Sequence, residues 1–402
     1  FDGATFEWDS DATGATSTRA TIIANCPTAS MQTLVSTPDR HLIAFGTETT
    51  IGTTSTQDDM YIRWSDQESI NATTSWTPSA TNTAGTQRLA DGTRIVAAIR
   101  GRDAIYVWTD TSLFIMRFVG APFVFSFQQV GTNCGLIGKN AAVEVDGSAY
   151  WMSENGFFRY TGKLESLACL VEDYVYDDIN TVPKQHIYAG LNNLFGEVSW
   201  FYPGSGAASN NRSVTYNYMD STPERPVWTT SSLARSTWSD SHIFGKPHAT
   251  EYDSSATSDT TVGNTDGVTI YYEHETGVNQ IKAGAATAIA ASIESGDFDI
   301  SLAQGGGANL RGDGEYMMKI RRVLPDFLQQ TGDARVTLNL KNYPTDSQTS
   351  SSLGPFTSTT STDKIDTRAR ARAISLKVDN TGTGQHWKLG TFRLDIQADG
   401  RR

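Results

Sequence analysis

The stretch AIYVWTDTSLFIMRF (residues 104–118) decides the fold class of this chain. Apolar side chains alternate with other residues on both sides of the polar turn TDTS, at Ile105 and Val107 before it and at Leu113 and Ile115 after it. Alternation with a period of two is typical of a strand with one buried face, and a short polar turn between two such strands predicts an antiparallel hairpin. We therefore expect a chain built from β-hairpins.

Aromatic residues beside polar or glycine-containing turns recur along the chain. Six of them follow one another at intervals of 44, 43, 49, 38 and 34 residues: Trp64, Trp108, Trp151, Trp200, Trp238 and Tyr272. A period of about 40 to 50 residues is typical of β-propellers, in which four-stranded sheets stack round an axis because one sheet cannot bury both of its faces. At about 44 residues per blade, residues 43–277 would hold five or six blades. The alternative is that nine Trp residues in an all-β protein fall at near-even spacing without a repeat.

After Gly277 the sequence pattern changes, and the aromatic repeat gives way to small residues and turn-forming clusters. Residues 281–293 suit either a short helix or a strand, because their small side chains fit both periods. Four further strand-like segments follow, separated by turn-forming clusters: residues 316–323, 334–340, 369–378 and 387–396. This spacing predicts a β-sandwich. We therefore expect an all-β chain with an N-terminal segment (1–30), a β-propeller (31–280) and a β-sandwich-like domain (281–402).

Two features are candidates for contact with other molecules. Arg368, Arg370 and Arg372 alternate with Ala369 and Ala371, so a strand there would place all three arginines on one face. Such a face could meet the carboxylates of a neighbouring subunit or DNA phosphates, and the acidity of the chain favours an acidic protein surface. Three polar stretches are also long enough to be contact loops: residues 204–213, 253–267 and 345–363.

Charge and cysteine content limit the classes of protein that fit. Lys and Arg total 32 against 44 Asp and Glu, a net charge of −12, whereas a general nucleic-acid binder usually presents a basic face. Three widely separated cysteines favour neither a disulfide framework nor a cysteine-rich zinc site, and they suit assembly in a reducing cytoplasm. The most apolar stretch, residues 105–127, is interrupted by Asp110 and Arg117 and predicts no membrane span. No signal peptide is recognisable.

The sequence lacks the residue patterns of known catalytic motifs. None of the six His stands in a metal-binding spacing, and neither a Gly-x-Ser-x-Gly elbow nor a phosphate-binding Gly-rich loop occurs. The pairs Asp177–Asp178 and Glu273–Glu275 could serve a glycosidase, although sequence neighbours do not predict the separation that two catalytic carboxylates need. We expect no enzyme activity, no cofactor and no metal. The alternative is a carbohydrate-binding or glycan-cleaving propeller acting on a host surface, with Trp108 or Trp151 in an open groove.

Residues 63–89, RWSDQESINATTSWTPSATNTAGTQRL, resemble the tail nozzle or hub proteins of short-tailed double-stranded DNA phages, also described as packaged-DNA stabilisation proteins. The resemblance covers most of the chain from residue 60 onward. Further similar stretches are residues 133–138 (NCGLIG), 150–153 (YWMS), 271–277 (YYEHETG), 324–327 (LPDF) and 399–402 (DGRR). These motifs are turns and strand cores, so they identify no active site.

The resemblance implies a non-enzymatic virion protein of the phage tail, a β-propeller subunit that forms a ring of commonly six copies. The ring would lie below the portal–adaptor complex, meet tail fibre or spike and needle proteins, close the DNA channel and let the genome exit on infection. Double-stranded DNA would pass through without specific binding, which agrees with an acidic chain that releases few counterions. Assembly would take place in the bacterial host cytoplasm. Arg368, Arg370 and Arg372 would then lie at a subunit or adaptor interface, and residues 281–402 would contact neighbouring tail proteins.

Overall fold

The computed structural model describes residues 3–8, 19–37, 39–240, 243–253, 267–282, 284–300, 316–343 and 351–400. Strands make up 55% of the structure and helices 4%, which confirms the predicted all-β class. The chain divides into two compact units, Phe1–Glu275 (unit 1) and Thr276–Arg402 (unit 2). The sequence places this boundary near residue 280.

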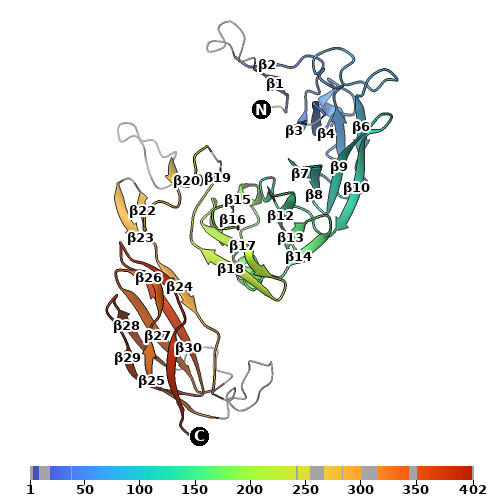
Figure 1. Ribbon diagram of the computed structural model, residues 1–402. Helices are drawn as coiled ribbons and strands as arrows, with labels where there is room; N and C mark the ends of the chain where they lie inside the picture. Colours follow the sequence, from blue (N-terminus) through green and yellow to red (C-terminus); the bar gives the residue numbers. More distant parts are fainter. Residues whose placement is uncertain are drawn as a thin grey trace. The chain divides into compact units, whose positions relative to one another are not determined.

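The described residues of unit 1 form five antiparallel sheets of three or four strands, each made of strands that are consecutive in the sequence (Figure 1). The first sheet contains β3 (Ser30–Ser36), β4 (His41–Thr47), β5 (Tyr61–Trp64) and β6 (Gly85–Arg88). The second contains β7 (Ile95–Arg100), β8 (Ile105–Thr109), β9 (Ser112–Gly120) and β10 (Val124–Thr132). The third contains β11 (Ala142–Val145), β12 (Ser148–Ser153), β13 (Gly156–Tyr160) and β14 (Leu164–Leu167).

The fourth sheet contains β15 (Tyr188–Asn192), β16 (Glu197–Tyr202), β17 (Arg212–Thr222) and β18 (Arg225–Ser231), and the fifth contains β19 (Thr237–Ser239), β20 (His248–Asp253) and β21 (Val268–Glu273). A small pair, β1 (Phe6–Glu7) and β2 (Thr21–Ile22), precedes these sheets. The helical elements are η1 (Thr54–Thr56), α1 (Glu172–Asp178) and η2 (Lys184–His186). The hairpin predicted at residues 104–118 is confirmed, since Trp108 on β8 pairs with Leu113 on β9.

The first strands of the five sheets lie in a row. β3 contacts β7, β7 contacts β11, β11 contacts β15, and β15 contacts β19. Between β3 and β7 the link is a side chain, because the Gln32 amide donates to the Ala98 carbonyl oxygen (2.6 Å) and accepts from the Ala98 backbone N–H (2.8 Å). Within the described part of the chain the row does not close, and neither a closed barrel nor a closed propeller is present.

Buried tryptophans connect the sheets of unit 1. Trp108, Trp151 and Trp200 lie on the second strands of the second, third and fourth sheets, and each is 0% exposed. The Trp200 indole Nε1–H donates to the Ala141 carbonyl oxygen beside the third sheet (3.0 Å), and that of Trp238 donates to Leu191 in the fourth sheet (2.7 Å). Packing between successive sheets therefore buries the rings that the repeat in the sequence marks.

Only part of the aromatic repeat falls at equivalent places in the sheets. Trp108, Trp151 and Trp200 do, whereas Trp64 lies on a third strand and Trp238 on a first strand. The near-even spacing of the six residues thus combines a true repeat over three sheets with positions that have other structural roles.

Unit 2 contains two larger sheets with one apolar core between them. One sheet has the order β24 (Ala291–Glu294), β30 (Ala373–Asn380), β27 (Ala334–Lys341), β28 (Ser351–Ser358). The other has the order β29 (Ile365–Ala371), β25 (Met318–Leu324), β32 (Arg393–Ala398). Two strand pairs complete the unit: β22 (Asn279–Lys282) with β23 (Ala285–Ala288), and β26 (Phe327–Thr331) with β31 (His386–Leu389).

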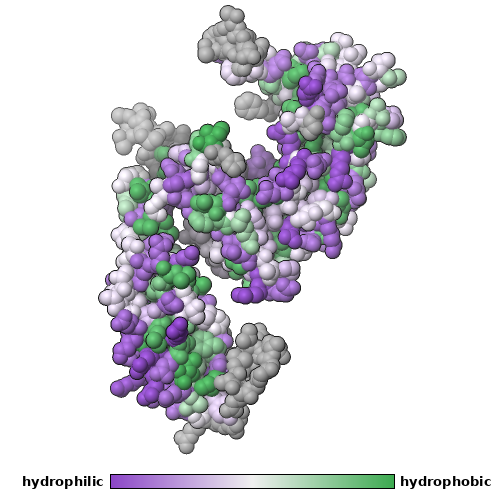
Figure 2. Space-filling model, viewed as in Figure 1, coloured by the Kyte–Doolittle hydropathy of each residue, from purple (hydrophilic) through white to green (hydrophobic). Residues whose placement is uncertain are grey.

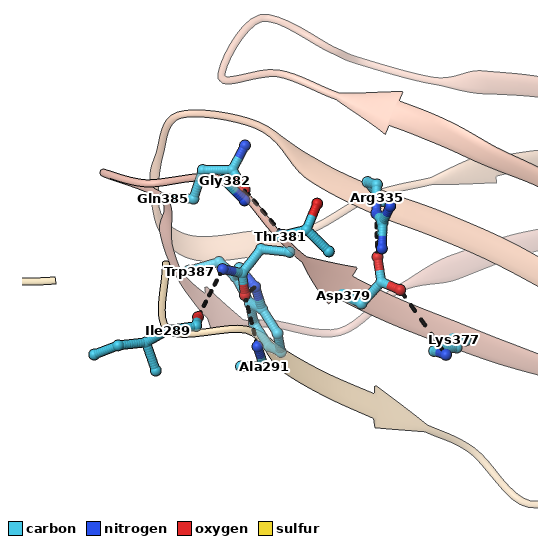
Figure 3. Close-up of polar contacts among 10 residues, drawn as sticks. Ile289, Ala291, Arg335, Lys377, Asp379, Thr381, Gly382, Gln385 and Trp387 are labelled. Atoms are coloured by element: carbon cyan, nitrogen blue, oxygen red, sulfur yellow. Dashed lines mark hydrogen bonds and ion pairs between the residues drawn. The ribbon is translucent and has the colours of Figure 1, made fainter. Parts of the chain in front are cut away.

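A polar contact secures one end of β30 (Figure 3). The Asn380 side chain, 3% exposed, donates to the Ile289 carbonyl oxygen (3.0 Å) and accepts from the Trp387 indole Nε1–H (3.0 Å) and the Ala291 backbone N–H (3.3 Å). Next to it, Asp379 pairs with Arg335 at 2.6 Å. One buried amide therefore joins β30 to the segment around β24 and to β31.

Several predicted segments of unit 2 differ from the structure. Residues 369–378 and 387–396 each form parts of two strands, because the chain bends at Arg372 and at Gly390 and continues in another sheet. Residues 281–293 contain strands and no helix in the described part. The prediction of a contact loop at residues 345–363 is wrong over residues 351–358, which form β28. Residues 345–350 of this loop, and residues 254–266 of the loop expected at 253–267, lie outside the described residues.

Candidate interaction surface

Two of the three predicted arginines lie on the outer face of one sheet of unit 2. On β29, Ala369 and Ala371 are 0% exposed and belong to the core, while Arg368 and Arg370 are exposed. The predicted alternation is therefore confirmed for Arg368 and Arg370, because small alanines fit the space between the two sheets and leave the long cationic side chains in solvent.

Arg372 does not share that face. It lies in the bend between β29 and β30, is half-buried, and donates its backbone N–H to the Lys341 carbonyl oxygen (3.1 Å). Since β29 and β30 belong to different sheets, the alternation of β29 stops before this residue. The expectation that all three arginines share one face is wrong for Arg372.

The neighbouring strands add cations that the sequence analysis did not single out. In the sheet register, Lys319 on β25 lies opposite Arg370, and Arg322 lies opposite Asp366. On β32, Arg393 lies opposite Leu324 at the edge of the same sheet. The signal was present in the run KIRR at residues 319–322, which falls inside a predicted strand. We call the outward cations of β25, β29 and β32 the basic face: Lys319, Arg322, Arg368, Arg370 and Arg393.

Ion pairs within the sheet occupy part of the basic face. Arg370 Nε lies 2.5 Å from Asp399 Oδ2, and Arg322 Nε lies 3.6 Å from Asp395 Oδ2 and 3.8 Å from Asp366 Oδ1. The Arg368 side chain makes no hydrogen bond or ion pair with any described residue. Exposed pairs of this kind contribute only about 0 to 1 kcal/mol, so a partner's carboxylate could replace them at little cost. On the side of the molecule shown in Figure 2, hydrophobic residues form separate patches among hydrophilic ones.

The two units differ in net charge. Unit 1 has 16 Lys and Arg against 31 Asp and Glu, a net charge of −15, whereas unit 2 has 16 against 13, a net charge of +3. The acidity of the whole chain thus belongs to unit 1. The basic face lies in the unit that does not share this excess of carboxylates.

The structure places the residues considered for catalysis or sugar binding in buried positions, in an ion pair or at the surface. Trp108 and Trp151 are both fully buried, so neither offers an open stacking platform. Asp178 forms an ion pair with Arg212 (3.3 Å), and Glu273 and Glu275 are exposed on the fifth sheet and just after it. In the part of the chain that the structure describes, no group of three or more His, Cys, Asp or Glu side chains is placed to hold a metal ion.

Two buried arginines in unit 1 were not foreseen from the sequence. Arg63, 5% exposed, donates to the Trp76 (2.9 Å) and Thr49 (2.7 Å) carbonyl oxygens and so fixes the long connections of the first sheet. Arg235, 3% exposed, lies 4.0 Å from the Tyr272 ring centroid and donates from Nε to the imidazole of His274 (2.9 Å). Only the tertiary fold brings these partners together, so no local pattern could have revealed them.

Burial keeps His274 neutral, and the neighbouring Arg235 charge adds to this effect. Burial, followed by the nearby charges of Arg235 and His248, lowers the pKa of His274 to about 4. The imidazole is therefore neutral near pH 7 and accepts the hydrogen bond from Arg235.

The free thiols of Cys26, Cys134 and Cys169 are withdrawn from solvent to different degrees. Cys26 and Cys134 are buried and Cys169 is half-buried, and burial raises the pKa of each thiol to about 11. A thiol with a raised pKa is a poor nucleophile near pH 7. Burial therefore disfavours the nucleophilic thiolate form of all three cysteines.

Comparison with known proteins gives no relative: no protein-family model matches the chain, and no curated protein matches it. Among the described residues, no helix has the length and apolar character that crossing a membrane requires. The basic face and the row of sheets are consequently the features from which a function can be argued.

Proposed function

We propose that this chain is a non-enzymatic structural protein of a phage virion, a ring-forming tail nozzle or hub. It would close the DNA channel below the portal–adaptor complex and let the genome exit on infection. The observation that carries the proposal is the row of five consecutive antiparallel sheets with their first strands side by side. This is how blades are arranged round a propeller axis. The resemblance of residues 63–89 and of the shorter stretches points to the same class.

In this proposal the five sheets of unit 1 are propeller blades and the two larger sheets of unit 2 form a β-sandwich. Tryptophans buried between sheets support the first assignment, because blades are stable only when neighbours cover their faces. A common core between the two sheets of unit 2 supports the second. Unit 2 would then be the part that contacts neighbouring tail proteins.

The charge distribution supports a division of labour between the two units. Unit 1, with a net charge of −15, has few cations to hold DNA phosphates, which suits a channel through which the duplex slides. The basic face of unit 2 suits an acidic surface on the next copy, on the portal–adaptor complex, or on fibre, spike or needle proteins. The protein would assemble in the host cytoplasm and function in the tail.

The carbohydrate-binding or glycan-cleaving alternative lacks a comparable observation. It needs aromatic platforms in an open groove, and the rings of Trp108 and Trp151 are buried. The paired carboxylates considered for it belong to an ion pair or to exposed strand ends.

The test is the mass of the purified protein by light scattering, with negative-stain images, alone and after mixing with a portal–adaptor complex. We expect a ring with a central hole, alone or on that complex. The double variant Arg368→Glu/Arg370→Glu should weaken assembly at least tenfold, because it reverses two charges on the basic face. Arg225→Glu, which changes an exposed cation on β18, is the matched control. A monomer that ignores the portal complex and is retained by a glycan column would overturn the proposal.

A further inference from the structure

Unit 1 has a cavity of about 630 Å³ at one end of the row of first strands. Its wall includes Gln32 on β3 and three cationic residues, Arg94, Lys139 and Lys184. A volume of this size lies within the range of small-ligand sites, about 300 to 1,000 Å³. The cavity is thus large enough for a small anion together with part of a larger molecule.

The three cations occupy corresponding places in successive sheets. Arg94 directly precedes β7, Lys139 lies three residues before β11, and Lys184 lies four residues before β15. Each belongs to the connection that leads from the last strand of one sheet to the first strand of the next. Because these first strands are adjacent, residues about 45 positions apart in the sequence line one cavity.

The fifth sheet has a cation at the same place, but that cation is occupied. Arg235 lies two residues before β19, is 3% exposed, and forms an ion pair with Glu251 at 3.4 Å. The repeat therefore places a basic residue before each first strand from β7 to β19, and only those before β7, β11 and β15 line the cavity.

The positive charge of the cavity is poorly neutralised by the protein. No acidic residue is among the described residues that line it. The side chains of Arg94 and Lys139 are exposed and make no hydrogen bond or ion pair with any described residue, while Lys184 Nζ lies 2.5 Å from Glu154 Oε1. In a unit with 31 acidic residues against 16 basic ones, a cavity lined by cations without carboxylates is a local reversal of charge. A bound anion would relieve the repulsion between these cations.

The remaining polar lining supplies uncharged donors. Asn140 and Gln185 both line the cavity and are exposed, so their amide N–H groups are available to a ligand. Arginine binds tetrahedral oxyanions through paired N–H donors, and lysine adds a compact charge. Several cations with amide donors suit an anion of more than one charge better than a single carboxylate.

We propose that this cavity is a phosphate-binding site, held by Arg94 and Lys139 with support from Lys184. The phosphate is either a free ion or small phosphomonoester, or the backbone phosphate of a nucleic acid. The site stands on the cavity and its charges alone, independently of the proposed tail function. Its recognition is of the phosphate group, with no base-specific contact implied.

The first experiment titrates the full chain with inorganic phosphate by calorimetry, in chloride buffers of equal ionic strength. We expect saturable binding with one site per chain. The double variant Arg94→Ala/Lys139→Ala should weaken it at least tenfold, since it removes two cations and their charge-assisted hydrogen bonds to the phosphate. The control Lys163→Ala removes an exposed cation from the β13–β14 turn of the same unit and should leave binding unchanged.

A second arm distinguishes the two sources of phosphate. If a 12-base-pair duplex competes with inorganic phosphate and its binding also requires Arg94 and Lys139, the ligand is a nucleic-acid backbone. If inorganic phosphate binds and the duplex does not compete, the ligand is a free phosphate or a phosphomonoester. Equal thermal midpoints of wild type and double variant in chloride buffer show that the variant is folded. The conservative variant Arg94→Lys/Lys139→Arg should retain binding within about threefold. Absence of binding by both probes, or binding unchanged in the double alanine variant, would overturn the proposal.

Discussion

The two units both consist of antiparallel strands, but they differ in how far apart paired strands lie in the sequence. In unit 1 each sheet uses consecutive strands, so each strand pairs with the next one along the chain, even across the long connection from Trp64 to Gly85. In unit 2, Ala291 on β24 lies 89 residues from its partner Asn380 on β30, and β25 pairs with both β29 and β32. A local hairpin needs only its own residues, whereas a distant pairing depends on the whole unit. This is why the repeat in unit 1 is readable in the sequence and the topology of unit 2 is not.

The units also differ in charge, at −15 against +3. The total of −12 describes neither unit. The net charge of the whole chain therefore has the same sign as that of unit 1 and the opposite sign to that of unit 2. Charge has to be assigned unit by unit before it is used to choose a partner.

The largest expected effect comes from removing a ring between two sheets of unit 1. Trp151→Ala deletes a fully buried side chain whose indole Nε1–H donates to the Cys134 carbonyl oxygen (2.8 Å). We expect a loss of about 3 to 5 kcal/mol in the free energy of unfolding, because a large cavity remains. In a urea titration followed by unit-specific probes, the unit 1 transition should move and the unit 2 transition should not. Equal movement of both would show that the units unfold as one.

The counterpart in unit 2 is a polar contact. Asn380→Ala leaves the Trp387 indole N–H and two backbone groups without their partner (Figure 3). We expect a loss of about 1 to 3 kcal/mol, confined to the unit 2 transition. Gln397→Ala, which removes an exposed amide on β32 of the same unit, serves as a check on amide removal outside this contact. A loss below 0.5 kcal/mol for Asn380→Ala, as expected of a solvated amide, would contradict this role.

A glycine pair tests how closely the sheets of unit 1 pack. A Cβ atom at Gly190 on β15 would lie 2.6 Å from Cγ of Trp238 in the next sheet, whereas one at Gly296 in unit 2 meets nothing within 4 Å. Gly190→Ala should cost about 1 to 3 kcal/mol by overpacking, and Gly296→Ala should change stability by less than about 1 kcal/mol. Thermal unfolding of both variants gives the comparison. Equal midpoints would mean that the fourth and fifth sheets are not in close contact.

The last expected effect depends on pH and belongs to unit 1. The pKa of His274 is lowered to about 4, so its contribution to stability is complete above its unfolded pKa of about 6.5 and is lost as the pH falls from there towards 4. Unit 1 should lose stability over this window. His274→Gln keeps an acceptor for Arg235 but cannot titrate, so it should flatten the pH dependence measured by urea unfolding at pH 7, 6, 5 and 4. An unchanged slope in the variant would assign the loss to other groups.

Part of the candidate surface was predictable and part was not. Alternation in the run RARAR was enough to place Arg368 and Arg370 outward with alanines in the core. The position of Arg372 could not be predicted from this alternation, because the chain bends there and passes from the sheet of β29 to the sheet of β30. The cations of β25 join the face only through register with β29, which no single strand specifies.

By itself, the sequence determined the all-β class, the hairpin at residues 104–118 and the tryptophan repeat over three sheets, because alternation and turns act between near neighbours. The tertiary structure decided that five first strands lie in a row, that Arg63 and Arg235 are buried among partners, and that Arg94, Lys139 and Lys184 line one cavity. These contacts join residues tens of positions apart. Their energies depend on the packing of whole sheets, which local patterns do not encode.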